Sequence, residues 1–368
     1  MKLRVVVAPD SFKGSLDATS VARALSLGLQ QGSTRPIDVI LRPMADGGEG
    51  TSLVLAPGGC DMPTPIVNVY GEPKQGWWRL QGDTAYIDAA VGSSFVAPPQ
   101  RGTRSAIATT SLGTGLLLRA AMAHSGVRHV VVALGGTGST DGGMGLMAAL
   151  GAKFYDKAHQ ALKPIGSNLS SVRTVEAMPN IQATITGLYD VAVPLTGPQG
   201  AVLSYGPQKG IPSDRLSELD QALAQFSRAL SPLDPMSSKT PGSGAAGGMG
   251  WGILRLGGSL RPGAQTVAEH IGLSEALYGA QWAITGEGQI DEQSHKGKVV
   301  GVVLALANAM NIPTLAVVGS RKGRLSALYD AGLRLAYSIV PGPMTEDQAM
   351  ALAAPLLEEA GYHLAHLI

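Results

Sequence analysis

The chain has 368 residues, of which 45% are hydrophobic and 15% charged, and its formal net charge is +1. This length allows two domains with a large buried core, and the small net charge gives no electrostatic basis for binding nucleic acid or an anionic membrane. The single cysteine, Cys60, excludes a disulfide within the chain and favours a reducing compartment, so we expect a cytoplasmic protein.

Short buried strands alternate with helices at both ends of the sequence. Near the N-terminus we expect strands at 4–8 and 39–41, on either side of a helix that opens at Ser15 and runs to about residue 31. Near the C-terminus we expect strands at 282–284, 314–318 and 333–340 and helices at 298–310, 325–331 and 345–366. This alternation predicts an α/β fold with a doubly wound parallel sheet.

The middle of the chain has a different pattern. The runs at 65–70, 77–80 and 85–88 are short and alternating, as in an antiparallel meander, and helices are expected at 115–125, 145–151 and 213–230. The glycine-rich segment 241–250 is interpreted as an ordered loop at a cleft. Because the parallel sheet draws on both chain ends, we expect one domain from residues 1–64 and 281–368. Residues 65–280 then form a second, mixed α/β domain inserted into it.

One pentapeptide pattern, Asp-Gly-Gly-x-Gly, occurs twice, at 46–50 and at 141–145. Each copy follows an apolar run and precedes a segment with helical character. Glycines at such turns let backbone N–H groups approach an anion closely, and the adjacent Asp suits a cation or a hydroxyl proton. The pattern therefore indicates phosphate together with magnesium, although glycine turns also occur in α/β proteins for steric reasons alone.

Further loops carry acids, hydroxyls or cations at the ends of expected strands, namely 10–15, 109–115, 189–200, 206–210 and 285–291. Phosphoryl transfer needs a metal held by carboxylates, positive groups on the migrating phosphate and a base for the acceptor hydroxyl, and these loops supply all three. No Gly-x-x-x-x-Gly-Lys-[Ser/Thr] sequence exists, which excludes a P-loop NTPase. The nearest dinucleotide fingerprint, 136–142, has its last glycine one residue late, so an NAD(P)-dependent dehydrogenase is a distant alternative.

Five strings, in order along the chain, resemble the bacterial type I glycerate kinases: Ala8 to Ser15, Pro43 to Thr51, Pro194 to Gly197, Gly206 to Gly210 and Thr285 to Gly288. The resemblance implies ATP-dependent phosphorylation of D-glycerate with Mg²⁺, usually to 2-phosphoglycerate. It also implies a flavodoxin-like domain and a second α/β domain with the active site in the cleft between them.

We therefore expect the following roles. The catalytic residues are Asp190, as base or metal-linked carboxylate, Lys13 and Asp291. The substrate-binding residues are Asp10, Ser11, Ser15, Thr110, Ser111 and Lys209, the last as an exposed cation. The nucleotide or phosphate-binding residues are Gly47, Gly48, Gly136, Thr137, Gly142, Gly143, Thr196, Gly197, Gly286, Gly288 and Lys298. The metal ligands are Asp46, Glu49, Asp141 and Glu287. The expected ligands are D-glycerate, ATP and Mg²⁺, with no nucleic acid or membrane, and the chain acts as a monomer or homodimer.

The sequence departs from the family pattern where asparagines are usual, with Thr140, Ala192 and Val193 in their place, and where Arg-Asn-Pro is usual, at 101–103. Two further alternatives stay open on this account: a related kinase acting on another small hydroxy acid, and a non-catalytic ligand-binding protein.

Overall fold

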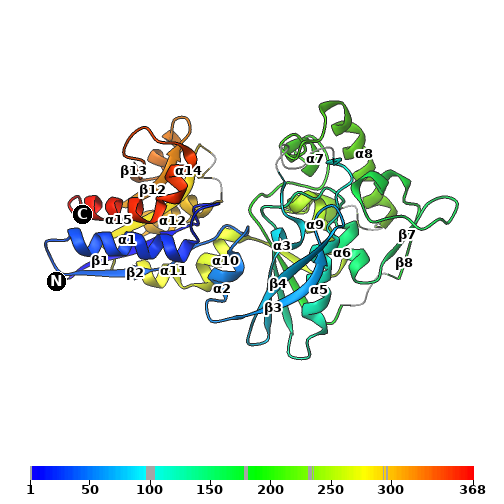
Figure 1. The fold of residues 1–368 in the computed structure, drawn as a ribbon, viewed down its shortest axis with the longest axis horizontal. Helices are drawn as coiled ribbons and strands as arrows, with labels where there is room; N and C mark the ends of the chain where they lie inside the picture. Colours follow the sequence, from blue (N-terminus) through cyan, green and yellow to red (C-terminus); the bar gives the residue numbers. More distant parts are fainter. Residues whose placement is uncertain are drawn as a thin grey trace. The chain divides into compact units, whose positions relative to one another are not determined.

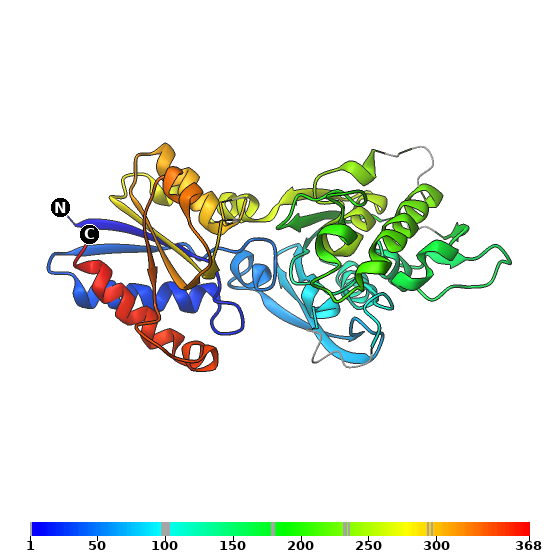
Figure 2. The same cartoon turned by 90° about the horizontal axis from the view of Figure 1, so that it is seen from above.

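The computed structural model describes residues 2–96, 104–177, 181–230, 234, 236–292, 294–295 and 297–368. The departure from the family pattern at 101–103 lies outside these residues. The chain divides into two compact units, residues 1–46 with 263–368 and residues 47–262, and Figures 1 and 2 show the elements of each. Within the described ranges, none of the helices is both long and apolar enough to span a membrane.

The first unit contains a five-stranded sheet in the order β13-β12-β11-β1-β2. All four pairings are parallel. The strands are β1 (Leu3–Pro9), β2 (Ile37–Leu41), β11 (Trp282–Ile290), β12 (Thr314–Arg321) and β13 (Leu333–Ser338). Counted along the chain this order is 2-1-3-4-5, the flavodoxin-like arrangement, whose direction of progression reverses between β1 and β11. The predicted doubly wound parallel sheet is confirmed.

Helices cover both faces of this sheet because its strands bury alternate residues on opposite sides. Leu315 and Val317 pack on one face with α1 (Ala18–Gly32) and α15 (Ala353–Ala365). Ala316 and Val318 pack on the other face with α12 (Val299–Ala309) and α13 (Ser326–Asp330). Figure 2 shows α1 in blue and α15 in red on the same side of the sheet. The unit also contains α10 (Gly263–His270), α11 (Leu273–Leu277) and α14 (Glu346–Ala351).

The second unit is built on a six-stranded mixed sheet in the order β10-β9-β6-β5-β4-β3. Its strands are β3 (Cys60–Val67), β4 (Pro73–Gln81), β5 (Thr84–Asp88), β6 (His129–Ala133), β9 (Thr184–Tyr189) and β10 (Ser259–Pro262). The predicted meander is present as the antiparallel β3-β4-β5, and β5, β6, β9 and β10 are parallel to one another. A separate pair, β7 (Lys153–Tyr155) and β8 (Thr174–Glu176), is antiparallel.

The helices of the second unit are α2 (Thr51–Leu55), α3 (Ala89–Ser93), α5 (Leu112–Ala123), α6 (Met144–Ala149), α7 (Ala201–Tyr205), α8 (Ser213–Leu230) and α9 (Ala245–Arg255). Apart from α2, which packs against β4 and β5, they pack around one largely aliphatic core that also contains Phe154, Phe226 and Trp251. The ring of Phe226 lies 5.8 Å from that of Phe154 and 5.7 Å from that of Trp251. The glycine-rich segment 241–250 forms a turn and the start of α9, where a Cβ on Gly247 would lie 2.0 Å from the carbonyl oxygen of Ser139.

The observed elements differ from the expected ones at three places. The unit boundaries fall at 46/47 and 262/263 instead of 64/65 and 280/281, because β3 pairs with β4 and because α10 and α11 pack on α12. Strand β11 continues to Ile290, since its pairing with β12 runs on to Arg321. The final helix is two helices, α14 and α15, because Pro355 has no N–H to donate to the carbonyl of Ala351.

The backbones of α1 and α15 touch at glycines. A Cβ on Gly28 would lie 1.8 Å from the carbonyl oxygen of Glu358, and one on Gly361 would lie 2.4 Å from that of Leu25. These distances leave no room for a methyl group, so the two helices rely on glycine to pack closely.

We therefore expect Gly28→Ala to lower the free energy of unfolding by roughly 1–3 kcal/mol, the usual cost of overpacking. In a helix without this contact the same change would stabilise by about 1 kcal/mol. Gly342→Ala is the control, because nothing lies within 4 Å of its Cβ position. Urea unfolding of both variants measures the effect, and a Gly28→Ala protein more stable than wild type would contradict the close contact.

Candidate active site

Acidic side chains gather at the carboxyl edge of the first sheet, where the strand order reverses. Asp10 directly follows β1 and donates its backbone N–H to the carbonyl of Gly286 on β11 at 2.8 Å. Burial raises the pKa of Asp10 well above its usual range, and Asp46 and Glu287 raise it further by repulsion. In parallel α/β sheets this reversal point is where ligands bind.

Glu287 has a raised pKa at the same edge. Burial raises its pKa to about 7, with Asp291 and Asp46 adding repulsion, while the Ser294 hydroxyl and Lys298 oppose the increase. Its Oε1 atom is buried and has no hydrogen-bond partner among the described residues. A buried carboxylate oxygen in this state favours a proton or a cation. Four residues expected in the site therefore interact electrostatically with Glu287, namely Asp10, Asp46, Asp291 and Lys298. Glu287 itself lies on strand β11 and not in the expected loop.

Loop 10–16 packs against β11 before α1 begins. The N-cap of α1 is Asp17, which accepts the Ser20 N–H at 2.8 Å, so Lys13 and Ser15 precede the first turn of that helix. A Cβ on Gly288 would lie 3.5 Å from the Lys13 backbone nitrogen, and the Lys13 side chain is exposed. The Ser15 hydroxyl donates to the carbonyl of Met350 at 2.7 Å. Ser11 donates its N–H to Asp10 at 2.6 Å.

In the second unit, three neighbouring parallel strands end at one edge and deliver Asp88, Gly135 and Asp190. Asp88 is the last residue of β5, Gly135 lies two residues beyond β6, and Asp190 directly follows β9. A Cβ on Gly135 would lie 2.7 Å from the Cα of Gly48 and 3.2 Å from the Oδ2 of Asp190. Gly135 also donates its N–H to the carbonyl of Gly47 at 2.9 Å. The first Asp-Gly-Gly loop therefore rests on the loop after β6, beside Asp190.

Further residues of the glycine-rich loops follow β6 and β9 in the second unit. Gly136 has a φ of 74°, and a Cβ there would lie 4.0 Å from that of Glu49. Thr137 is buried. Gly197 has a φ of 98° with nothing within 4 Å of its Cβ position, and its N–H donates to Asp220 at 3.2 Å. Thr196 precedes it and is partly exposed.

Lys209 is a buried cation, which corrects the expectation of an exposed one. Only 9% of its surface is exposed, and its Nζ donates to the carbonyl of Ser139 at 2.7 Å. Burial lowers its pKa to about 8, while Asp141 and Asp190 raise it. The ammonium group thus holds the loop after β6 from within the unit, close to two acids.

Asp141 holds the second Asp-Gly-Gly loop together by hydrogen bonds. It is fully buried, and it accepts the Ser111 N–H and hydroxyl at 2.7 and 2.8 Å and the N–H groups of Gly145 and Gly143 at 2.9 and 3.1 Å. These bonds lower its pKa, which burial raises. Carboxylate oxygens occupied in this way tie loops together instead of facing a ligand.

Several expected binding residues lie in the interior around Asp141. Thr110 donates to the carbonyl of Pro164 at 2.6 Å, and both it and Ser111 are buried. A Cβ on Gly142 would lie 2.7 Å from the Cδ1 of Leu223. Gly143 packs on Gly252 in the same way, and Gly286 in the first unit packs on Val317. These residues serve packing, which the sequence does not reveal because their contacts lie far along the chain.

The sequence interpretation missed Asp88. It is 2% exposed and binds the N–H groups of Gly50 and Ser52 and the Ser52 hydroxyl. The one signal was an acid at the end of an apolar strand.

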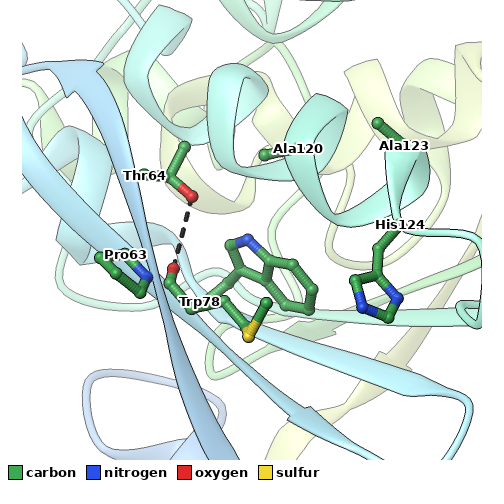
Figure 3. Close-up of a pocket in the computed structure, with 7 residues that line it drawn as sticks. Pro63, Thr64, Trp78, Ala120, Ala123 and His124 are labelled. Carbon is green, nitrogen blue, oxygen red and sulfur yellow. Dashed lines mark hydrogen bonds between the residues drawn. The ribbon is translucent and has the colours of Figure 1, made fainter.

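A shallow pocket with a volume of about 270 Å³ lies elsewhere on the second unit, lined by Met62, Pro63, Thr64, Trp78, Ala120, Ala123 and His124. Figure 3 shows Trp78 and His124 beside α5, with their rings edge to face at 6.1 Å. None of the expected site residues lines it, and His124 is its one titratable side chain. Its lining does not suit an anionic substrate.

Comparison with known proteins identifies the family. The glycerate kinase family model matches residues 5–368. The glycerate kinase of Bacillus subtilis (strain 168) is 35% identical over 99% of this chain and 97% of its own length. The glycerate 2-kinase of Escherichia coli (strain K12) is 32% identical over 94% and 93%.

A crystal structure assigned to a glycerate kinase 2 from Salmonella typhimurium LT2 superposes with a TM-score of 0.82 at 31% identity, covering 100% of this chain and 98% of that one. With the full-length sequence match and the acidic strand ends described above, these findings show that the chain belongs to the glycerate kinase family.

Proposed function

We propose that this kinase transfers the γ-phosphate of ATP to D-glycerate and that carbon 2 is the acceptor position. The main observation is the acid group at the reversal point of the first sheet, where Asp10 and Glu287 are half-buried and have raised pKa values. The choice of carbon 2 follows the name of the E. coli relative, a glycerate 2-kinase, and the type I assignment is part of the same proposal.

Magnesium is the metal that fits this acid group. Among the described residues no group of three or more His, Cys, Asp and Glu side chains is arranged to hold a metal ion. Mg²⁺ does not need one, since it is usually bound by one or two carboxylates together with substrate phosphates and water. The unpartnered Oε1 of Glu287 suits this role. We propose that Glu287 binds the ion together with at most one of Asp10 and Asp46, and we leave out Asp141, whose oxygens are occupied by hydrogen bonds.

When bound, Mg²⁺ would offset the negative charge of the ATP phosphates. Around it, Lys298 contributes positive charge near Glu287, and Asp291 contributes a further negative charge. Lys13, exposed beside Gly288, supplies a further cation for a carboxylate or phosphate.

Asp190 is our candidate for the base that orients the acceptor hydroxyl. It lies beside Gly135 and Gly48, and its negative charge raises the pKa of the buried Lys209. Backbone N–H groups of Gly47, Gly48, Gly136 and Gly197 are proposed to bind phosphate oxygens. Glu49, which is expected from the sequence as a metal ligand, is exposed next to Gly136 at this edge of the second unit.

The dehydrogenase alternative has no support beyond its sequence pattern. Its last glycine, Gly142, is packed against Leu223 in the core and is not placed for a pyrophosphate. We also propose that the enzyme works in the cytoplasm, where ATP is available, as a monomer or homodimer.

A coupled assay of ADP release with D-glycerate and magnesium-ATP tests the function. Phosphorus NMR of the product identifies the carbon, because phosphate on carbon 2 couples to one proton and phosphate on carbon 3 to two. Turnover only with another hydroxy acid would reassign the substrate, and silence with all hydroxy acids would favour a non-catalytic protein.

For Asp190→Asn we expect a fall in kcat of roughly 10²-fold or more, the usual contribution of a general base, with the fold intact. The substitution keeps the shape and much of the capping capacity of the side chain. Asp156→Asn is the matched control, since Asp156 caps a turn of the same unit by accepting the N–H groups of Ala158 and Gln160. Equal kinetics of the two variants would leave Asp190 only a capping role.

Lys13→Met keeps the apolar stem and removes the ammonium group. If Lys13 binds the glycerate carboxylate in the ground state, KM for glycerate rises and kcat stays nearly unchanged, which is the result we expect. A fall in kcat instead would assign Lys13 to the moving phosphoryl group. Normal constants, as expected for the exposed control Lys2→Met, would remove loop 10–16 from the site.

Magnesium should raise the thermal unfolding temperature of the wild-type protein, because a ligand that binds the folded state stabilises it. The increase should be larger at pH 8 than at pH 6, since Glu287 has a pKa of about 7 and a ligand carboxylate must be deprotonated. Glu287→Gln should lose most of the increase, and the exposed Glu275→Gln should keep it. An unchanged response in Glu287→Gln would exclude Glu287 as a ligand.

A further inference from the structure

Asp88 binds the segment that follows the first Asp-Gly-Gly motif. From the end of β5 its Oδ2 accepts the Gly50 N–H and the Ser52 hydroxyl, both at 2.9 Å, and its Oδ1 accepts the Ser52 N–H at 3.0 Å. Asp88 and Ser52 are 2% and 1% exposed. These partners lie 36 and 38 residues earlier in the chain, so this contact fixes a distant loop.

The two copies of the motif differ in what binds their backbone. In the second copy Asp141 accepts the N–H of Gly145 within its own motif at 2.9 Å. The corresponding N–H in the first copy belongs to Gly50, and it is bound by Asp88. In the first copy, a carboxylate from outside the motif therefore binds the N–H that the motif's own Asp binds in the second copy. The Asp of the first copy, Asp46, interacts instead with the acids Asp10 and Glu287.

The loop held by Asp88 lies at the edge where Asp190 is found. Its Gly47 carbonyl accepts the Gly135 N–H at 2.9 Å, and its Gly48 carbonyl accepts the Thr51 hydroxyl at 2.7 Å. The Gly135 Cβ position is 2.7 Å from the Gly48 Cα and 3.2 Å from the Asp190 Oδ2. A small shift of loop 47–50 would therefore change the surroundings of Asp190.

We propose that Asp88 is a positioning residue for phosphoryl transfer: through Gly50 and Ser52 it fixes loop 47–50 in the conformation that binds the ATP phosphates beside Asp190. This rests on the proposed function, in which Gly47 and Gly48 bind phosphate. Asp88 acts through the loop backbone and does not touch the substrate.

The energetics of burial support this role. Removing a carboxylate from water is costly unless hydrogen bonds compensate, and burial raises the pKa of Asp88 to about 6 despite the bonds from Ser52 and Gly50. The group is therefore ionised at neutral pH and accepts three bonds from one short segment. Bonds of this kind are the strongest available to a backbone N–H, so the loop is held firmly.

The test compares Asp88→Ala, Asp88→Asn and Ser52→Ala with the control Asp17→Ala. Asp17 makes the same kinds of bond at the start of α1, accepting the N–H and hydroxyl of Ser20 at 2.8 and 2.9 Å, in the other unit. Calorimetric titration with magnesium-ATP gives the affinity, and the ADP assay gives kcat and KM for ATP. Hydrogen exchange at Gly50 and Ser52 reports the loop directly.

We expect Asp88→Ala to weaken ATP binding and to lower kcat/KM for ATP by up to about 10²-fold, the effect of a misplaced binding group. Asp88→Asn, which keeps one acceptor oxygen, should recover part of the loss. Ser52→Ala, which keeps both N–H bonds, should show a smaller loss with faster exchange at Gly50. Asp17→Ala should keep wild-type ATP affinity.

Wild-type ATP affinity in folded Asp88→Ala would overturn the proposal. If that variant does not fold, wild-type affinity in both Asp88→Asn and Ser52→Ala overturns it. The titration needs no acceptor substrate, so a wild-type protein that binds ATP but leaves D-glycerate unchanged would refute the proposed substrate and still decide the role of Asp88.

Discussion

In both units, carboxylates at the ends of parallel strands are partly or fully removed from water. Asp88 and Asp141 are buried in the second unit, Asp10 and Glu287 are half-buried in the first, and removal from water raises the pKa of all four. A buried anion must obtain compensation from hydrogen bonds, a proton or a cation. The source of this compensation distinguishes the carboxylates that hold loops together from those that are available for chemistry.

The acids of the second unit obtain compensation from backbone N–H groups. Asp141 and Asp88 accept bonds from glycine-rich segments, and the loops in turn are fixed by them. The acids of the first unit repel one another, and Glu287 keeps a buried oxygen without a partner among the described residues. A cation would offset that repulsion, which is the physical reason for placing the proposed metal there. The motif is thus structural in its second copy, and we propose a chemical role for the first.

The fold was largely predictable because buried parallel strands are continuous apolar runs, and the loops at their carboxyl ends are marked by Asp and Gly. The same signal marks Asp10, Asp46 and Asp190 as candidate site residues. The signal could not show that Lys209 is buried, because its partner Ser139 is 70 residues away. Nor could it show that Ser111 donates a hydrogen bond to Asp141, which lies 30 residues further along the chain. Asp88 carries the same signal at the end of β5, but its partners Gly50 and Ser52 lie 38 and 36 residues earlier and could not be predicted. Thr140 replaces a usual asparagine, and its buried hydroxyl has no hydrogen-bond partner in the described part of the chain. Nothing in the sequence explains this replacement.

A crystal structure of the enzyme with ADP and Mn²⁺ in place of Mg²⁺ would show where the metal binds, because the anomalous signal of manganese locates the ion independently of any assumed chemistry. The account predicts a peak within about 2.0–2.3 Å of a carboxylate oxygen of Glu287, Asp10 or Asp46, as expected for a hard divalent ion. A metal bound instead by Asp141 or Asp88, with their backbone hydrogen bonds broken, would contradict the division of the buried acids into structural and chemical groups.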